Sequence, residues 1–112
     1  MAPSDGLTEL EQLVMLSVIR LGDDAYAAEV RRDLAEGADR EVSAATAHVT
    51  LVRLERRGLL DSCESDPEPV RGGRSRRCFR PTPEGVEALR KAREVMDRMW
   101  ARVRGHPRLR EA

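Results

Sequence analysis

The sequence predicts a mainly α-helical fold with a small β-hairpin, on a chain of 112 residues that fits one small domain. Three apolar-periodic segments come first, each with a helix start signal and a glycine near its end. Two short mixed segments around a Pro- and Gly-rich loop follow, and they predict the hairpin. The last long segment begins with a capped proline, which predicts a final helix longer than the others.

The first two predicted helices have clear local signals. "LTELEQLVMLSVIRLG" begins with Thr8 and Glu11 at the spacing of a capping box, in which each side chain satisfies a backbone N–H at the helix start. Gly22 suits its end. "DDAYAAEVRRDLAEG" is the second helix, with Asp24 as the expected N-cap. Its apolar residues recur every four positions on one side: Tyr26, Val30 and Leu34.

The third predicted helix, "SAATAHVTLVRLERRG", has two contrasting faces. Ser43 is a good N-cap and Gly58 suits the end. One face is apolar, and the other has small residues at its start and arginines at its end. Small residues allow a close backbone approach, Thr and His can bond base edges, and Arg can reach phosphate. The alternative is a solvated helix whose arginines serve helix propensity. The second face comprises Ala44, Ala45, Thr46, His48, Thr50, Arg53, Arg56 and Arg57.

Positive charge is concentrated in the predicted hairpin, although the whole chain has a formal net charge of zero. "LLDSCES" and "SRRCFRP" are the predicted strands, and "DPEPVRGG" is the loop between them. Residues 69–80 contain five arginines and no acid, whereas residues 1–39 contain nine acids and three arginines. The neutral total therefore conceals a local positive field, which favours contact with a polyanion.

The last predicted helix, residues 83–104, has more apolar surface than a small domain can cover. Thr82 is its expected cap and Pro83 its first residue. Two apolar rows run along it, so we expect one row to pack on the first helix and the other to meet a second subunit. The predicted dimer interface comprises Leu89, Met96, Met99, Trp100 and Val103.

The order of these elements is that of a winged helix-turn-helix followed by a long C-terminal dimerisation helix. We expect residues 1–81 to form the DNA-binding domain, residues 82–104 to form the dimerisation helix of the same compact unit, and residues 105–112 to be a loose basic tail. The second and third helices would form the helix-turn-helix, with the third in the major groove.

The sequence resembles the small PadR-like transcriptional regulators. The stretches that carry the resemblance are "LTELEQLVMLSVIRLGDDAYAAEV", "VSAATAHVTLVRLERRGLL" and "RGGRSRRCFRPTPEG", which span about residues 7–100 in the expected order. The resemblance implies a dimeric DNA-binding repressor with a C-terminal dimerisation helix. It also implies that some members respond to small aromatic or drug-like effectors.

Individual positions carry this resemblance unevenly. Ser43 and residues 46–50 match the start of the family's recognition helix, residues 53–58 its "RLExxG" end, residues 71–77 its wing and residues 82–85 the start of its last helix. Two departures fall on the recognition helix. Ala45 stands where the family usually has a small flexible residue, often Gly, and His48 stands where it usually has Tyr. An operator sequence therefore does not transfer from relatives.

These observations predict a sequence-specific DNA-binding transcriptional regulator, a homodimeric repressor of an inverted-repeat operator. Double-stranded DNA and a second copy of the chain are its expected partners. The helix at 43–58 and the arginines of the wing are the expected contacts. The recognition-helix residues are Ser43, Ala45, Thr46, His48, Val49, Thr50 and Arg53, and the wing residues are Arg71, Arg74, Arg76 and Arg77.

The sequence contains only weak signals for catalysis or metal binding, so we expect no catalytic residue, cofactor or metal. His48 and His106 lie far apart and neither falls in a ligand-spaced cluster, whereas a zinc site needs three or four ligands. No apolar run approaches the roughly 18 residues of a membrane span. Residues 1–6 are polar and too short for a signal peptide, so we expect a cytoplasmic protein.

Two alternative functions stay open. Trp100, with Met96, could form a platform for a small planar aromatic effector, which would make the dimer a ligand sensor or a ligand-sequestering protein. A winged helix that binds proteins instead of DNA is the other, and the acidic first half of the chain favours it. The uncompensated arginines of the wing oppose it.

The two cysteines, Cys63 and Cys78, fall on the strands that flank the wing loop. Two reduced, partly buried thiols are the favoured expectation for a cytosolic protein. The alternative is a disulfide that locks the wing, which requires Cα atoms within about 7 Å of each other.

Overall fold

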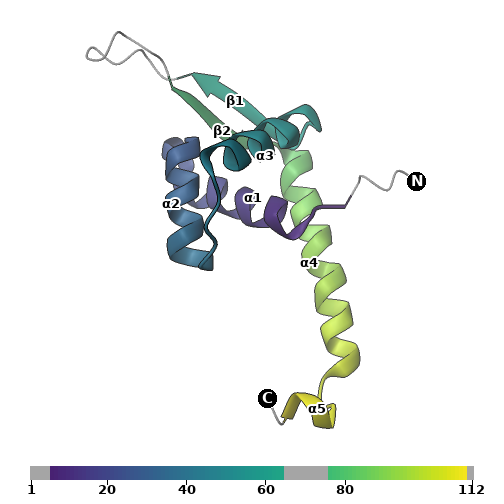
Figure 1. The fold of residues 1–112 in the computed structure, drawn as a ribbon. Coiled ribbons are helices and arrows are strands. Elements are labelled where there is room, and N and C mark those ends of the chain that lie inside the picture. The colour runs from purple at the N-terminus through teal and green to yellow at the C-terminus, as the bar shows by residue number, and fades with distance from the viewer. Residues whose placement is uncertain (1–5, 65–75, 111–112) are drawn as a thin grey trace.

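The computed structural model describes residues 6–64 and 76–110, and the chain folds into helices with one hairpin. In chain order the elements are α1 (Glu9–Leu21), the 3₁₀ turn η2 (Gly22–Asp24), α2 (Ala27–Ala38), α3 (Ala44–Arg56), β1 (Leu60–Glu64), β2 (Arg77–Pro81), α4 (Pro83–Val103) and α5 (Pro107–Arg110). Figure 1 shows α1, α2 and α3 packed together, the hairpin beside α3, and α4 extending away from this body. The mainly α fold with a small hairpin and a long C-terminal helix is confirmed.

Three helix starts follow the local sequence signals. The Thr8 hydroxyl accepts a hydrogen bond from the Glu11 N–H at 3.1 Å, and the Thr8 N–H donates to the Glu11 carboxylate at 2.8 Å. This reciprocal pair is the predicted capping box. The Ser43 hydroxyl likewise accepts from the Thr46 N–H, and the Thr82 hydroxyl from the Gly85 N–H.

The start of the second helix differs from the prediction. Asp24 lies in the 3₁₀ turn η2, and α2 begins at Ala27, after Tyr26 in an extended conformation. The returning strand β2 explains the shift, because it pairs with this segment. The Phe79 N–H donates to the Ala25 carbonyl at 3.0 Å, and Tyr26 forms a β-bridge with Cys78. A long-range pairing thus overrides the local capping signal of Asp24.

The core lies between the three helices and the hairpin. Phe79 of β2 is its largest fully buried side chain, and it anchors the returning strand among residues from every other part of the body. Burial of apolar surface is the main favourable term in such a small fold. The other core residues are Val14, Met15, Val18, Ala25, Val30, Leu34, Leu51, Leu54, Leu59 and Leu60.

The hairpin is antiparallel, with Leu60 opposite Pro81 and Cys63 opposite Cys78. The Cα atoms of the two cysteines are 5.1 Å apart, inside the range that a disulfide requires, and the structure joins them in a disulfide. The expectation of two separate reduced thiols is therefore wrong for this structure. The two side chains meet because Cys63 and Cys78 are directly opposite each other in the hairpin, a register that the sequence could only suggest.

The junction between the body and α4 is tightly packed. The Thr82 hydroxyl donates to the Gly58 carbonyl at 2.7 Å, and Gly85 is buried against the backbone of Leu59. Beyond this junction α4 leaves the body, which gives the molecule extents of 60 × 33 × 21 Å (Figure 1). Part of the tail, predicted to be loose, forms the short helix α5.

Candidate nucleic-acid interface and dimer face

The first two turns of α3 present an exposed surface of small and polar side chains. Ala45, Thr46 and His48 are exposed, and Val49 is 49% exposed. The opposite side of the same turns is buried, because Ala47 and Leu51 belong to the core side of the helix. Arg53 and Arg56 are exposed farther along. The exposed start of α3 is therefore free to approach another molecule closely.

Two of the predicted recognition residues have roles inside the helix. Thr50 is only 5% exposed, and its hydroxyl donates to the Thr46 carbonyl at 2.7 Å. Ser43 is exposed, but its hydroxyl caps α3 and also donates to the Thr46 hydroxyl at 2.9 Å. Thr50 thus lies off the exposed surface that Thr46 and His48 share.

The predicted wing arginines divide into two groups. Arg71 and Arg74 lie outside the described residues. Arg76 forms an ion pair with Glu29 of α2 at 2.7 Å, and its guanidinium carbon lies 3.8 Å from the centre of the Tyr26 ring. Arg77 forms an ion pair with Glu55 of α3. Both arginines therefore contact the helix-turn-helix.

Glu55 links α3 to both strands of the hairpin. It accepts a hydrogen bond from the Ser62 hydroxyl of β1 at 2.6 Å, and it pairs with Arg77 of β2. The Ser62 hydrogen bond, followed by the hydrogen bond and then the charge of Arg77, holds the pKa of the Glu55 carboxyl below its usual value against the opposing effect of burial. Sequence reasoning placed Glu55 in the "RLExxG" pattern without finding this role, because both partners lie later in the chain.

Two further ion pairs fix the helices around this surface. Asp33 of α2 accepts from Arg20 and from the Ser17 hydroxyl of α1, and the Arg20 hydrogen bond is the main cause of a lowered pKa for its carboxyl. Glu11, almost fully buried, pairs with Arg57 at 3.3 Å and so joins the start of α1 to the end of α3. These contacts hold α2 and α3 at a fixed orientation.

The outer part of α4 exposes most of the predicted dimer residues. Met96, Met99 and Trp100 are 53%, 54% and 55% exposed, and Val103 is also exposed. Leu89 differs, since it is half-buried and packs against the core of its own chain. The exposed set faces solvent in the single chain and could be covered by another molecule.

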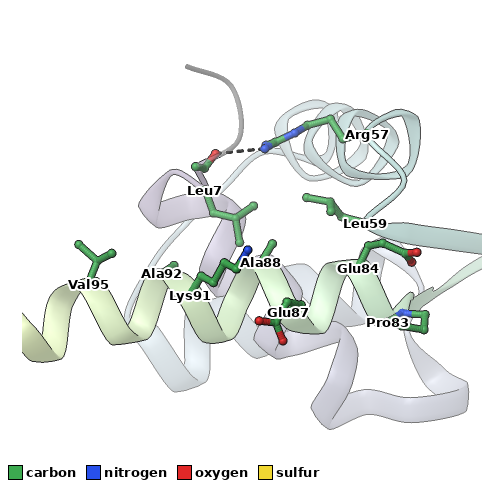
Figure 2. A pocket seen from close by; sticks show the side chains of 11 residues that line it. Leu7, Arg57, Leu59, Pro83, Glu84, Glu87, Ala88, Lys91, Ala92 and Val95 are labelled. Atoms are coloured by element: carbon green, nitrogen blue, oxygen red, sulfur yellow. Dashed lines mark hydrogen bonds between the residues drawn. The ribbon is translucent and has the colours of Figure 1, made fainter. Parts of the chain in front are cut away.

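Grooves flank α4 on both sides. Figure 2 shows one of about 950 Å³, in which Ala88, Ala92 and Val95 of α4 face Leu7 and Leu59 of the body. The charged side chains on its α4 wall are Glu84, Glu87 and Lys91. The groove on the other side, about 410 Å³, is lined by residues that include Leu16, Leu89 and Met96. That groove reaches one member of the predicted ligand platform, Met96, and is not lined by the other, Trp100.

Within residues 6–64 and 76–110 no group of three or more His, Cys, Asp and Glu side chains is placed to hold a metal ion. In the same ranges, no helix has the length and apolar character needed to cross a membrane.

Three packed helices, a two-stranded wing and an exposed start of the third helix define a winged helix-turn-helix protein. Solved structures extend this result, although no protein-family model and no curated protein matches the sequence. The chain is 31% identical to a PadR family transcriptional regulator from Eggerthella lenta DSM 2243, over 93% of this chain and 88% of that one, with a TM-score of 0.61. A PadR-like transcription factor from B. fragilis is 25% identical over 85% and 86% of the two chains, with a TM-score of 0.71.

A Streptococcus transcriptional regulator is also similar, at 26% identity over 86% of this chain and 89% of that one, with a TM-score of 0.65. The chain belongs to the PadR family of transcriptional regulators. Members of this family are regulators and not enzymes, in agreement with the prediction from sequence.

Proposed function

We propose that this protein is a homodimeric transcriptional repressor, acting in the cytoplasm, that binds an inverted-repeat operator through the start of α3. The observation that carries the proposal is the exposed surface of Ala45, Thr46, His48 and Val49 on a PadR-family fold. The repressor role rests on the family resemblance. The assignment of DNA contacts rests on the geometry and chemistry of this surface.

The start of α3 suits a major groove. Ala44 and Ala45 allow the backbone close to the base edges, and Thr46 and His48 supply groups that can donate or accept hydrogen bonds there. The exposed Val49 can contact a thymine methyl group. The helix N-terminus also favours nearby phosphate. We therefore assign sequence readout to Thr46, His48 and Val49, while Ser43 and Thr50 shape the helix.

Backbone contacts would come from cations around this surface. Arg53 and Arg56 are exposed on α3, beyond the readout residues. Arg71 and Arg74 are the wing residues that we propose as phosphate contacts, on the basis of sequence alone. Such contacts position the protein on DNA and make the affinity depend on salt.

The proposed dimer would form through residues 82–104, with α4 as its main element. Met96 and Val103 are seven residues apart, with Met99 and Trp100 between them, and Leu89, seven residues before Met96, packs on its own chain where the row begins. This is the spacing of a coiled-coil seam, which places one apolar row against a partner helix. The grooves on both sides of α4 leave room for that helix. A dimer with two-fold symmetry would bind half-sites about one helical turn apart.

Binding of a planar aromatic effector is a second candidate function. The observation that favours it is the 55% exposure of Trp100, one turn from the exposed Met96. In the proposed dimer, two Trp100 rings could stack a flat molecule between them. Titration with planar aromatic compounds should quench Trp100 fluorescence and lower operator affinity. Unchanged fluorescence and affinity would remove this candidate.

The DNA-binding proposal is tested by readout variants. His48→Ala and Thr46→Ala should each change the preferred sequence in a selection from random DNA, with a loss of about 1–3 kcal/mol on the wild-type operator. Glu36→Ala, an exposed change on α2, is the matched control and should select the wild-type operator. Identical selections for wild type and both α3 variants would contradict the assignment.

A further inference from the structure

We infer that Arg76 and Arg77 act as positioning residues that hold the hairpin against α2 and α3, and that they are not phosphate contacts of the wing. The inference rests on the proposed DNA-binding function and specifies which arginines carry it. It departs from the sequence-based expectation, in which all four wing arginines contact the DNA backbone.

Arg76 is engaged on two sides by the helix-turn-helix. Its guanidinium pairs with Glu29 at 2.7 Å and lies over the Tyr26 ring at 3.8 Å. Tyr26 is itself bridged to Cys78 of β2, so the ring and the arginine belong to one contact between the hairpin and α2. Both the charge and the flat face of the guanidinium are used in this contact.

Arg77 makes the corresponding contact between the hairpin and α3. It pairs with Glu55, approaches the Ser62 hydroxyl at 3.4 Å, and lies 5.5 Å from the Phe79 ring centre. Glu55 also accepts from Ser62, so one carboxylate of α3 holds both strands. The two arginines therefore join the hairpin to both helices of the helix-turn-helix.

These contacts have a direct electrostatic consequence. A guanidinium that is paired with a carboxylate contributes less net charge at a distance than an unpaired one, and the carboxylate repels a phosphate that approaches the same group. Removal of such an arginine should misplace the wing and leave the number of neutralised phosphates unchanged. The carboxylate partners should be as necessary for operator binding as the arginines are.

The test is the salt dependence of operator binding for Arg76→Gln, Arg77→Gln, Glu29→Gln and Glu55→Gln. We expect each variant to bind the operator about two- to fivefold more weakly, as for loss of a partly exposed ion pair. The slope of log Kobs against log salt should stay at the wild-type value. Arg53→Gln is the control, and its slope should become shallower by about 0.9 for each phosphate that the protein no longer neutralises.

The glutamate variants distinguish a positioning role from a phosphate contact, because operator affinity should fall in the first case and rise in the second. If Arg76 bound phosphate, Glu29→Gln would remove a competing negative charge, and the operator affinity would rise. A rise in affinity for Glu29→Gln, or a shallower salt slope for Arg76→Gln, would overturn the inference. Failure of the wild-type protein to bind any DNA would instead overturn the proposed function. In that case hydrogen exchange still tests the positioning role, because Arg77→Gln should lower the protection of amides in β2 and Arg53→Gln should not.

A separate observation, the disulfide, carries a second inference. We propose that the Cys63–Cys78 pair is a reversible redox latch at the base of the wing. Oxidation of the two thiols by a peroxide forms the S–S bond, and the two electrons and two protons reduce H₂O₂ to two waters. A dithiol reductant reverses the step and becomes a disulfide itself.

The latch is accessible and well placed. A hollow of about 210 Å³ borders both cysteines, together with Gly22, Asp23 and Tyr26, and is large enough to admit a small peroxide. The bond joins β1 to β2 across a sequence separation of 15 residues. A cross-link between β1 and β2 restricts the conformations open to the pair of strands, so the oxidised protein should bind the operator more tightly.

Operator affinity of the peroxide-treated and dithiothreitol-treated protein tests the latch, with peptide mass mapping of the linked pair. We expect the oxidised form to bind about threefold more tightly or better. The double variant Cys63→Ser/Cys78→Ser should bind equally after either treatment. Absence of the linked peptide after peroxide, or equal affinities of the two wild-type forms, would overturn the proposal.

Discussion

The body of the molecule and the outer half of α4 use apolar residues in opposite ways. In the body, residues such as Leu51, Leu54 and Phe79 are almost fully buried against their own chain. On outer α4, Met96, Met99 and Trp100 each leave about half of their surface in solvent. Both regions have regular apolar spacing in the sequence, so spacing alone does not tell intramolecular from intermolecular packing.

The two regions therefore have different roles in this small chain. A domain of this size buries a limited fraction of its surface by itself. The body reaches a closed core through three helices and a hairpin, and this core fixes the orientation of α3. On outer α4 the side chains of Met96, Met99 and Trp100 are about half exposed in the single chain, which favours a role in assembly. The two regions should therefore respond differently to the same kind of substitution.

Truncation of the core should have the largest effect. Phe79→Ala removes the largest fully buried side chain and should lower the free energy of unfolding by about 3–5 kcal/mol. Urea denaturation followed by circular dichroism, at several protein concentrations, measures this loss. A loss below about 1 kcal/mol would mean that the hairpin does not depend on the core and would weaken the comparison.

The junction between the two regions should be the next most sensitive position. A Cβ on Gly85 would collide with the Leu59 carbonyl oxygen and lie 2.9 Å from the Met15 methyl carbon. Because the first obstacle is backbone, Gly85→Ala should destabilise the fold by about 3 kcal/mol in the same denaturation assay. Gly37→Ala is the matched control, since nothing lies within 4 Å of its Cβ position. Equal stability of the two variants would contradict the observed docking of α4.

Trp100→Ala should affect assembly and leave the fold of the body intact. Loss of a central aromatic residue from an interface costs about 2 kcal/mol or more of association free energy. Sedimentation equilibrium should show a weaker dimer, with an unchanged circular dichroism spectrum. Val49→Ala, a similarly exposed position on α3, should keep the dimer and alter DNA binding. A monomeric wild-type protein would contradict the proposed role of α4.

The smallest effect should come from acidification. The pKa of Glu55 is lowered in the folded chain, so its pairing stabilises the fold above the ordinary pKa of 4.5 and is lost as the pH falls through the lower folded value. The pKa of the Asp33 carboxyl is also lowered, from an ordinary value of 3.8, so its pairing is likewise lost as the pH falls. The urea midpoint should therefore drop between about pH 5 and pH 3, and Glu55→Gln should drop less. The same pH dependence for both proteins would show that Glu55 has no stabilising pair.

Features set by neighbouring residues could be predicted from the sequence, and features set by distant residues could not. The caps at Thr8, Ser43 and Thr82 depend on a few adjacent residues, and each was found. Asp24 failed as a cap because β2, more than 50 residues later, pairs with the segment after it.

Contacts with distant residues also explain what the sequence did not predict at the candidate site. The cationic wing was visible in the sequence, but the acids that hold Arg76 and Arg77 come from α2 and α3. Thr50 was assigned to the face of small residues and arginines, whereas its hydroxyl donates within the helix and its side chain is buried. Partners of charged and polar side chains follow from the tertiary arrangement.

Selection of bound fragments from the source genome is the most direct test of the central claim that this is a dimeric, DNA-binding regulator. The account predicts enrichment of a few fragments that share an inverted repeat, with half-site centres about 10 base pairs apart, and loss of that repeat in the His48→Ala selection. No enrichment, or enrichment of a single asymmetric site that His48→Ala leaves unchanged, would contradict it.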